Sequence, residues 1–132
     1  MAGMALDDTT KQLVDGKNFG VLATVNPDGS PQTSVLWVGL DGDTVVISAL
    51  ANRRKVRNIQ RDPRVSLTIT DAANPYQSVE IRGKADVTTD PERSMSFRLS
   101  HKYAGEDPPA DPPGTSRVIV RITPEKVIGF SV

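Results

Sequence analysis

Cysteine is absent from this 132-residue sequence, and histidine occurs only once, as His101. The missing thiols exclude disulfides, thiolate catalysis and zinc-cysteine sites. A Ser-His-Asp triad or a histidine-based metal centre would have to be built around that single imidazole. The acidic residues are dispersed near predicted turns, and no pair stands at the spacing of a carboxylate dyad or a metal cage. The sequence therefore predicts neither a metal site nor a catalytic side chain.

An excess of charge and a long apolar run are also missing. The sixteen basic and sixteen acidic side chains cancel, so no global field draws the chain to nucleic acid or to an anionic membrane. No 18 apolar residues run together, and the first eleven residues lack the apolar stretch of a signal peptide. No aromatic residue lies between Trp37 and Tyr76, which argues against a stacking platform for single-stranded nucleic acid. We expect a cytoplasmic protein that binds neither membrane nor nucleic acid.

Periodicity and turn residues predict one mainly β domain spanning residues 1–132. We expect strands at residues 19–25, 32–40, 44–49, 65–70, 76–87, 117–122 and 126–130, with the last two hinged at Pro124. The tight turns between the early strands, such as Asn26-Pro27-Asp28-Gly29, are typical of hairpins. These elements favour an α+β barrel of six to seven antiparallel strands over a sandwich.

Three short helices are expected between the strands. Residues 1–17 contain the first, capped by Asp7 or Asp8 and stopped at Gly16, since glycine readily takes the left-handed conformation of a helix end. The second starts after Ala51 and ends before Pro63. The third starts at Asp90-Pro91-Glu92, with proline at the first helical position, and runs to about Lys102. Four prolines make residues 104–115 a surface loop.

One segment is devoid of acid: between Asp43 and Asp62 all the charged residues are basic, namely Arg53, Arg54, Lys55, Arg57 and Arg61. Backbone N–H groups at the start of the predicted helix favour an anion. Arginine adds a planar fork for phosphate oxygens, lysine a point charge, and Ser48 ends the preceding strand with a hydroxyl. Composition alone favours the alternative that these charges only solvate an exposed helix face, because most charge runs do so.

Two stretches carry a resemblance to a known family: GVLATVNPDGSPQTSVLWV at residues 20–38 and ISALANRRKVRNIQRDPRVSL at residues 47–67. They resemble the pyridoxamine 5′-phosphate oxidase-like split β-barrel proteins. More closely, they resemble the F420-dependent branch of the flavin/deazaflavin oxidoreductase superfamily. The pattern R-x-K-x-R-N at residues 53–58 is the most specific piece. The resemblance covers residues 19–87, with a weaker match at residues 118–129, and implies an FMN-binding-like split barrel that forms a homodimer.

The same resemblance implies a cofactor held at the subunit interface. Contacts to its phosphate are implied for Ser48, Arg53, Lys55 and Arg57, and Asn58 of the same pattern is an implied cofactor-binding residue. Gln32 and Ser34, on a strand along the ring system, are implied ring contacts. Tyr76 either covers the cofactor from the partner subunit or packs at the start of a strand.

The implied function is that of an oxidoreductase in which reduced coenzyme F420, an 8-hydroxy-5-deazaflavin, delivers hydride to an unsaturated or quinone-like organic substrate. Arg54 and Arg61 would suit the anionic oligoglutamate tail of this coenzyme. Two alternatives stay open: an FMN-dependent oxidase or reductase, and a non-catalytic cofactor-binding module. The absence of a Rossmann fingerprint and of a Walker loop argues against nicotinamide dinucleotide and ATP.

For Trp37 and His101 the sequence predicts a structural role, with a role in the site as the alternative. Trp37, the sole tryptophan, is expected in the core, with a place against the cofactor ring or the dimer interface as the alternative. His101 is expected to interact with the end of its helix, with a place in the substrate pocket as the alternative.

Overall fold

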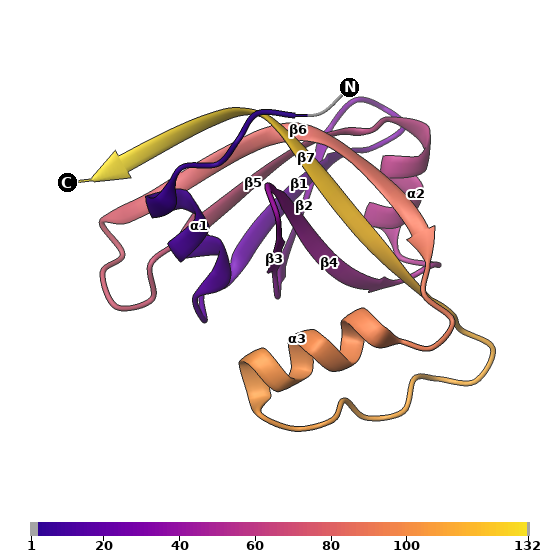
Figure 1. The fold of residues 1–132 in the computed structure, drawn as a ribbon. Helices are drawn as coiled ribbons and strands as arrows, with labels where there is room; N and C mark the ends of the chain where they lie inside the picture. The colour runs from indigo at the N-terminus through magenta and orange to yellow at the C-terminus, as the bar shows by residue number, and fades with distance from the viewer. Residues whose placement is uncertain (1–2, 132) are drawn as a thin grey trace.

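The computed structural model describes the backbone of residues 3–131, whose strands form one curled antiparallel sheet (Figure 1). The strands are β1 (Gly20–Val25), β2 (Pro31–Leu36), β3 (Gly39–Asp41), β4 (Thr44–Leu50), β5 (Arg64–Thr70), β6 (Gln77–Thr89) and β7 (Arg117–Ser131). The helices are α1 (Asp8–Asp15), α2 (Arg54–Arg61) and α3 (Ser94–Ala104). The predicted α+β, mainly β class is confirmed.

The sheet curls because its two ends are joined by a very short connection. Its strand order is β2-β1-β5-β6-β7-β4-β3, so that β2 and β3 stand at opposite ends. Only Trp37 and Val38 separate these two strands along the chain. Gln32 of β2 and Ser48 of β4 accordingly line the same cavity, although four strands lie between them in the sheet order. This geometry is the predicted split barrel.

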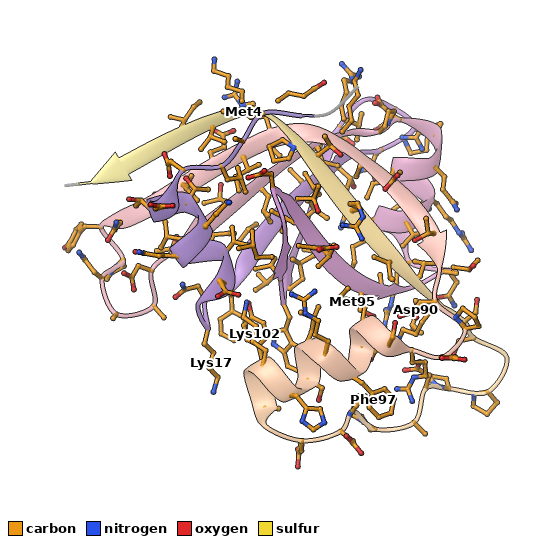
Figure 2. The ribbon with its side chains drawn as sticks, in the orientation of Figure 1. Met4, Lys17, Asp90, Met95, Phe97 and Lys102 are labelled. Atoms are coloured by element: carbon orange, nitrogen blue, oxygen red, sulfur yellow. The ribbon has the colours of Figure 1, made fainter. Side chains whose placement is uncertain are left out.

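Apolar side chains fill the inside of the curled sheet. Ile47 of β4 and Leu67 of β5 are fully buried there, and Val56 of α2 closes one end. Outside the barrel, Met95 of α3 packs against Val46 of β4 (Figure 2). Strand β4 is therefore apolar on both faces, which explains its continuous Val-Val-Ile run.

The strand predicted at residues 32–40 is broken in two, between β2 and β3. At the break, the Val38 N–H donates to the Tyr103 hydroxyl at 3.2 Å. The Val38 carbonyl accepts from the Lys102 ammonium at 2.6 Å. Side chains of α3 thus replace strand partners for this backbone, a long-range substitution that β periodicity alone does not reveal.

The two strands predicted around Pro124 are one strand, β7. Its pairing with β6 shifts register between Arg82 and Gly83, so that Gly83 pairs with Pro124. A proline is tolerated in a strand at such an irregularity, because the missing N–H is not needed by the ladder. A Cβ at Gly83 would lie 2.1 Å from the Thr123 carbonyl oxygen, so only glycine permits this close approach.

The start of α3 and the end of α1 both differ from the prediction. Helix α3 begins at Ser94, because the buried Asp90 carboxylate accepts from the N–H groups of Ser94 at 3.0 Å and Met95 at 2.9 Å (Figure 2). Proline therefore does not occupy its first turn. Helix α1 is capped by Asp7 and stops at Gly16 as expected. However, the Gly16 φ is −68° rather than left-handed, and a Cβ there would meet the Gln12 carbonyl oxygen at 3.0 Å.

Candidate functional site

The start of α2 lacks the carboxylate that caps the other helices of the described chain. Asp7 accepts from the Thr10 N–H at 2.7 Å in α1, and Asp90 accepts from the Met95 N–H at 2.9 Å at the start of α3. At α2 the N-cap is Arg53, which makes no side-chain capping bond, and the first turn holds no acid. The positive end of this helix is therefore open to an external anion.

A cavity of about 400 Å³ opens beside this helix start. Side chains from β2, β4, α2 and β7 meet there because the barrel curls. We call it the basic cavity, defined by Gln32, Ser34, Ser48, Ala49, Leu50, Arg53, Arg54, Lys55 and Arg117. Four of these residues are cations and none is acidic. A phosphate in this cavity would meet positive charge, hydroxyl groups and unpaired helix N–H groups together.

The cations in the basic cavity repel one another. Burial lowers the pKa of Lys55, and the positive charges of Arg53 and Arg117 lower it further. Among the described residues, Lys55 has no carboxylate ion-pair partner. A bound anion would relieve this repulsion and raise the pKa of Lys55.

A hydrogen-bonded chain orients the two predicted ring contacts. Asn58 Nδ2 donates to Thr24 Oγ1 at 3.0 Å, and Thr24 Oγ1 donates to Gln32 Oε1 at 2.7 Å. Gln32 Nε2 in turn donates to Ser34 Oγ at 2.9 Å. The Ser34 hydroxyl proton is thereby left to donate into the basic cavity. Asn58 is fully buried and does not line the cavity, so its position supports an orienting role toward β2.

Five of the eight predicted site residues meet in the basic cavity: Gln32, Ser34, Ser48, Arg53 and Lys55. Arg57 is exposed on α2 and does not line the cavity. Tyr76 is 66% exposed, just before β6, and also lies outside it. The structure of one chain therefore gathers both ring candidates and three of the phosphate candidates, Ser48, Arg53 and Lys55, but leaves Arg57 and Tyr76 apart.

Arg117 is a cavity residue that the sequence pattern did not predict. Its Nε and Nη2 donate to the Asp111 carboxylate at 2.9 and 2.8 Å, while Nη1 lies 3.5 Å from Ser48 Oγ. It enters the site because β7 pairs with β4, which places Arg117 opposite Leu50. That pairing joins residues far apart in sequence, so no local motif could have indicated it.

Trp37 and His101, the sole tryptophan and the sole histidine, each contact a neighbouring side chain. Trp37 is 37% exposed, and its ring stacks on Tyr103 at a centroid distance of 5.2 Å. The prediction that Trp37 lies in the core is therefore wrong. His101 is exposed, and its Nε2 lies 2.6 Å from Asp107 Oδ1 in the following loop, so it contacts that loop rather than only its own helix.

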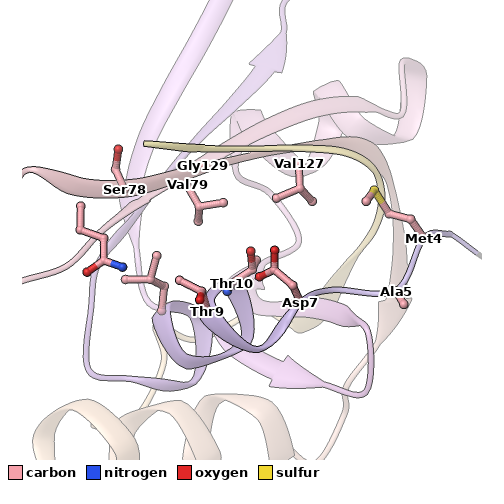
Figure 3. Close-up of a pocket in the computed structure, with 11 residues that line it drawn as sticks. Met4, Ala5, Asp7, Thr9, Thr10, Ser78, Val79, Val127 and Gly129 are labelled. Atoms are coloured by element: carbon pink, nitrogen blue, oxygen red, sulfur yellow. Dashed lines mark hydrogen bonds between the residues drawn. The ribbon is translucent and has the colours of Figure 1, made fainter. Parts of the chain in front are cut away.

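A different cavity, of about 480 Å³, lies between α1 and the sheet where β6 begins and β7 ends (Figure 3). Asp7, Thr10 and Ser78 supply polar groups to its lining. None of the residues that line it is a lysine or an arginine, and Asp7 adds negative charge. This cavity is not suited to a phosphate.

Within the part of the chain that the structure describes, no group of three or more histidine, cysteine, aspartate or glutamate side chains is placed to hold a metal ion. None of the helices described is both long and apolar enough to cross a bilayer.

Comparison with known proteins places the chain and its fold in a family. The sequence profile described as Pyridoxamine 5′-phosphate oxidase matches residues 6–130. The chain belongs to this family. A solved structure named F420 Reductase shares 32% identity with this family member at a TM-score of 0.82, covering 93% of this chain and 98% of that one. The predicted resemblance to the F420-dependent branch is supported by this similarity.

Other solved structures share the fold at lower identity. A conserved hypothetical protein from Mycobacterium tuberculosis is 24% identical with a TM-score of 0.76, covering 99% of this chain and 88% of that one. General Stress Protein 26 from Bacillus anthracis is 19% identical with a TM-score of 0.67, covering 90% of this chain and 88% of that one. The fold therefore occurs in proteins with different names, and family membership supports a flavin-type oxidoreductase without choosing the cofactor.

Proposed function

We propose that this protein is an oxidoreductase that uses reduced coenzyme F420 to deliver hydride to an unsaturated or quinone-like organic substrate. The observation that carries the proposal is the basic cavity, with four cations and no carboxylate in its lining at an uncapped helix start. Such a site favours an anionic ligand, because Asp111 pairs with Arg117 alone among these four cations. The similarity to an F420 reductase supports a deazaflavin as that ligand.

The residues of the basic cavity fit the parts of such a coenzyme. Lys55, Arg53 and the helix N–H groups would hold the phosphate, as the family motif implies. Arg54 extends the positive charge toward solvent, where an anionic tail would leave the cavity. Gln32 and Ser34 present amide and hydroxyl groups from β2, beside which the ring system would lie.

The chemistry would come from the coenzyme, because a reduced deazaflavin supplies a hydride once bound. The contribution of the chain is to orient that ring through Ser34 and Gln32 and to leave one ring face open to a substrate. No side chain is required as a nucleophile. Solvent or a nearby donor protonates the product.

A titration of the purified protein with coenzyme F420 and FMN, side by side and followed by cofactor fluorescence, tests the cofactor. We expect saturable binding of F420 that is tighter than that of FMN. Reduced F420 should then reduce a quinone or enone faster than a heat-inactivated control. Tighter FMN binding would favour a flavin oxidase or reductase. F420 binding without transfer to any acceptor would favour a non-catalytic binding module.

The proposal includes a homodimer with the cofactor at the subunit interface. An apolar strip is exposed on the outer face of the β1–β2 hairpin, where Val21 pairs with Val35 and both side chains face solvent at 40% and 71% exposure. Phe19, 57% exposed just before β1, extends this strip. Burial of such a strip against a second copy would stabilise a dimer. A cytoplasmic location remains a prediction.

A further inference from the structure

A further cavity, of about 390 Å³, adjoins the basic cavity and shares Ser48 and Arg117 with it. It lies between the end of β2, helix α3 and the loop of residues 105–116. We call it the loop cavity, defined by Val35, Leu36, Trp37, Ser48, Ser96, Leu99, Ser100, Pro108, Pro109 and Arg117. Its volume falls within the range of small-molecule sites.

Apolar side chains from three segments supply just over half of the wall of the loop cavity. The Trp37 ring lies parallel to the Tyr103 ring, with an interplanar angle of 3°, and this stacking holds the indole in place. Leu99 is 2% exposed in α3 and packs on the outer face of β4. Pro108 and Pro109 have restricted backbones. A flat, largely apolar ring compound would match these surfaces.

The loop wall is held by an ionic cluster rather than by a strand or a helix. Arg93 Nη2 donates to the Pro109 carbonyl at 2.7 Å, and Arg93 Nε lies 3.0 Å from Asp111 Oδ2. Arg117 pairs with the same carboxylate. Arg93 takes a left-handed φ of 59°, the only non-glycine residue of the described chain to do so. This conformation costs free energy, which the cluster offsets.

Two hydrogen-bond donors in the loop cavity are left without a strong protein acceptor. Arg117 uses Nε and Nη2 on Asp111, while its Nη1 has only the 3.5 Å contact with Ser48. The Ser96 side chain is 7% exposed, and its hydroxyl makes no hydrogen bond among the described residues. Asp111 balances one of the two guanidinium charges of Arg93 and Arg117, and the free donors of Arg117 and Ser96 suit a carbonyl oxygen.

We infer that the loop cavity is a separate ligand site for a flat, apolar ring compound with a carbonyl oxygen. Arg117 and Ser96 donate to that oxygen, and Trp37 contacts the ring. Arg117 thereby serves both cavities and places the ligand beside the basic cavity. The role of this ligand as the hydride acceptor rests on the proposed function, whereas its binding does not require the cofactor.

The single tryptophan provides the test, because Trp37 lines the loop cavity and is absent from the lining of the basic cavity. Protein labelled with ¹⁵N and free of cofactor is titrated with 1-indanone, and the one indole N–H signal is followed by NMR. Indane, which has the same fused ring without the carbonyl, is the matched probe. We expect a saturable shift with 1-indanone, and binding of indane about fivefold weaker through loss of the hydrogen bonds.

The variants separate the donors from general effects of charge. Arg117→Gln should weaken 1-indanone binding about fivefold, and Ser96→Ala should weaken it by a few fold. Arg121→Gln, which removes a guanidinium from the same strand outside both cavities, should change it less than twofold. If Arg117→Gln does not fold, Ser96→Ala alone decides the role of the donors. An indole signal that does not move, or equal affinity for both probes, overturns the inference.

The result of the 1-indanone titration can be distinguished from the result of the cofactor titration. Binding of 1-indanone without binding of F420 or FMN would uphold the loop cavity and remove the proposed function. Binding of F420 without an indole shift on addition of 1-indanone would uphold the cofactor site and remove the loop cavity as a ligand site.

Discussion

Individual side chains decide the charge of the basic cavity. Burial and two neighbouring guanidinium groups lower the pKa of Lys55, whereas Asp111 neutralises part of Arg117. The contrast follows from where a carboxylate is available, since Asp111 belongs to the loop that faces Arg117 and no acid faces Lys55 in the described chain. The cation without a partner is the one expected to contribute most to anion binding.

Substitution of Lys55 tests this expectation. Lys55→Ala should weaken F420 binding by about 1.5–3 kcal/mol, the usual contribution of a charge-assisted hydrogen bond, without unfolding the protein. Fluorescence titration measures the affinity, and thermal unfolding checks the fold. Lys84→Ala, at an exposed lysine of β6, is the control and should bind as the unmodified protein does. Unchanged affinity in Lys55→Ala would place the cofactor elsewhere.

Arg57 gives a separate prediction. The family motif predicts a comparable loss of affinity for Arg57→Ala, although Arg57 is exposed and lies outside the basic cavity. A loss of about 1.5 kcal/mol or more in the same titration would require the cofactor to extend along α2 or a contact across the subunit interface. An affinity equal to that of the unmodified protein would limit the phosphate site to the cavity residues.

Lys102 predicts a pH dependence of stability. Burial lowers its pKa to about 8, with Asp15 raising it and Arg98 lowering it in smaller measure, and its ammonium lies 4.8 Å from the centre of the Tyr103 ring. Between pH 8 and the ordinary lysine pKa of 10.5, the folded chain carries this amine neutral and the unfolded chain carries it protonated. The free energy of unfolding contributed by Lys102 therefore rises with pH across that window.

Urea unfolding of the unmodified protein and of Lys102→Met at pH 7, 8 and 9.5 measures this contribution. The difference between the two cancels most other titrating groups. We expect the unmodified protein to gain stability relative to Lys102→Met above pH 8. A constant difference across the three pH values would mean that Lys102 titrates alike in the folded and unfolded chains.

At the scale of elements, the irregularity between β6 and β7 lets two long strands stay paired past a proline. Gly83 makes it possible, because the Thr123 carbonyl occupies the space that a side chain would need. Strand β7 consequently runs from Arg117, at the basic cavity, to the far end of the sheet without a break. The pairing of β7 with β4 that brings Arg117 into the site depends on this continuous strand.

Gly83→Ala should therefore destabilise the fold. The added Cβ would overlap a backbone oxygen that cannot move without breaking strand pairing, at a cost of about 3 kcal/mol. Gly129→Ala is the matched control on β7, since nothing lies within 4 Å of a Cβ there. Chemical denaturation of both variants measures the difference. Equal stability of the two variants would mean that β6 and β7 can shift around Pro124 without loss of pairing.

At the scale of the whole molecule, one face of the β1–β2 hairpin is apolar yet exposed. Val35 is 71% exposed near the end of β2 (Pro31–Leu36), a strand that forms one end of the sheet. An end strand with apolar side chains toward solvent is prone to association unless a defined partner covers it. The proposed homodimer supplies that partner.

We expect sedimentation equilibrium to find a dimer, and Val35→Glu to raise its dissociation constant about 30-fold, or about 2 kcal/mol, because a carboxylate would be buried without a partner. Thr88→Glu, at an exposed position of β6 away from this strip, should leave the dimer unchanged. A monomeric unmodified protein, or a Val35→Glu variant that associates as before, would contradict the interface.

Much of the fold follows from local pattern. The alternation in β1 and β5, the Asp7 cap of α1 and the basic start of α2 all depend on neighbours within a few residues. The break at Val38 was not predictable in this way, because it results from a hydrogen bond to Tyr103, 65 residues along the chain. The late start of α3 has a local cause, since the Asp90 carboxylate accepts from the N–H groups of Ser94 and Met95.

The candidate site divides along the same line. Its residues at the start of α2 could be predicted from the sequence, because all the charged residues of that short segment are basic. Arg117, the role of Asn58 toward Gln32 and the exposed place of Trp37 depend on which strands pair and how far the sheet curls. Chemical identity and short-range pattern are encoded residue by residue, whereas proximity between the ends of a curled sheet exists only once the chain has folded.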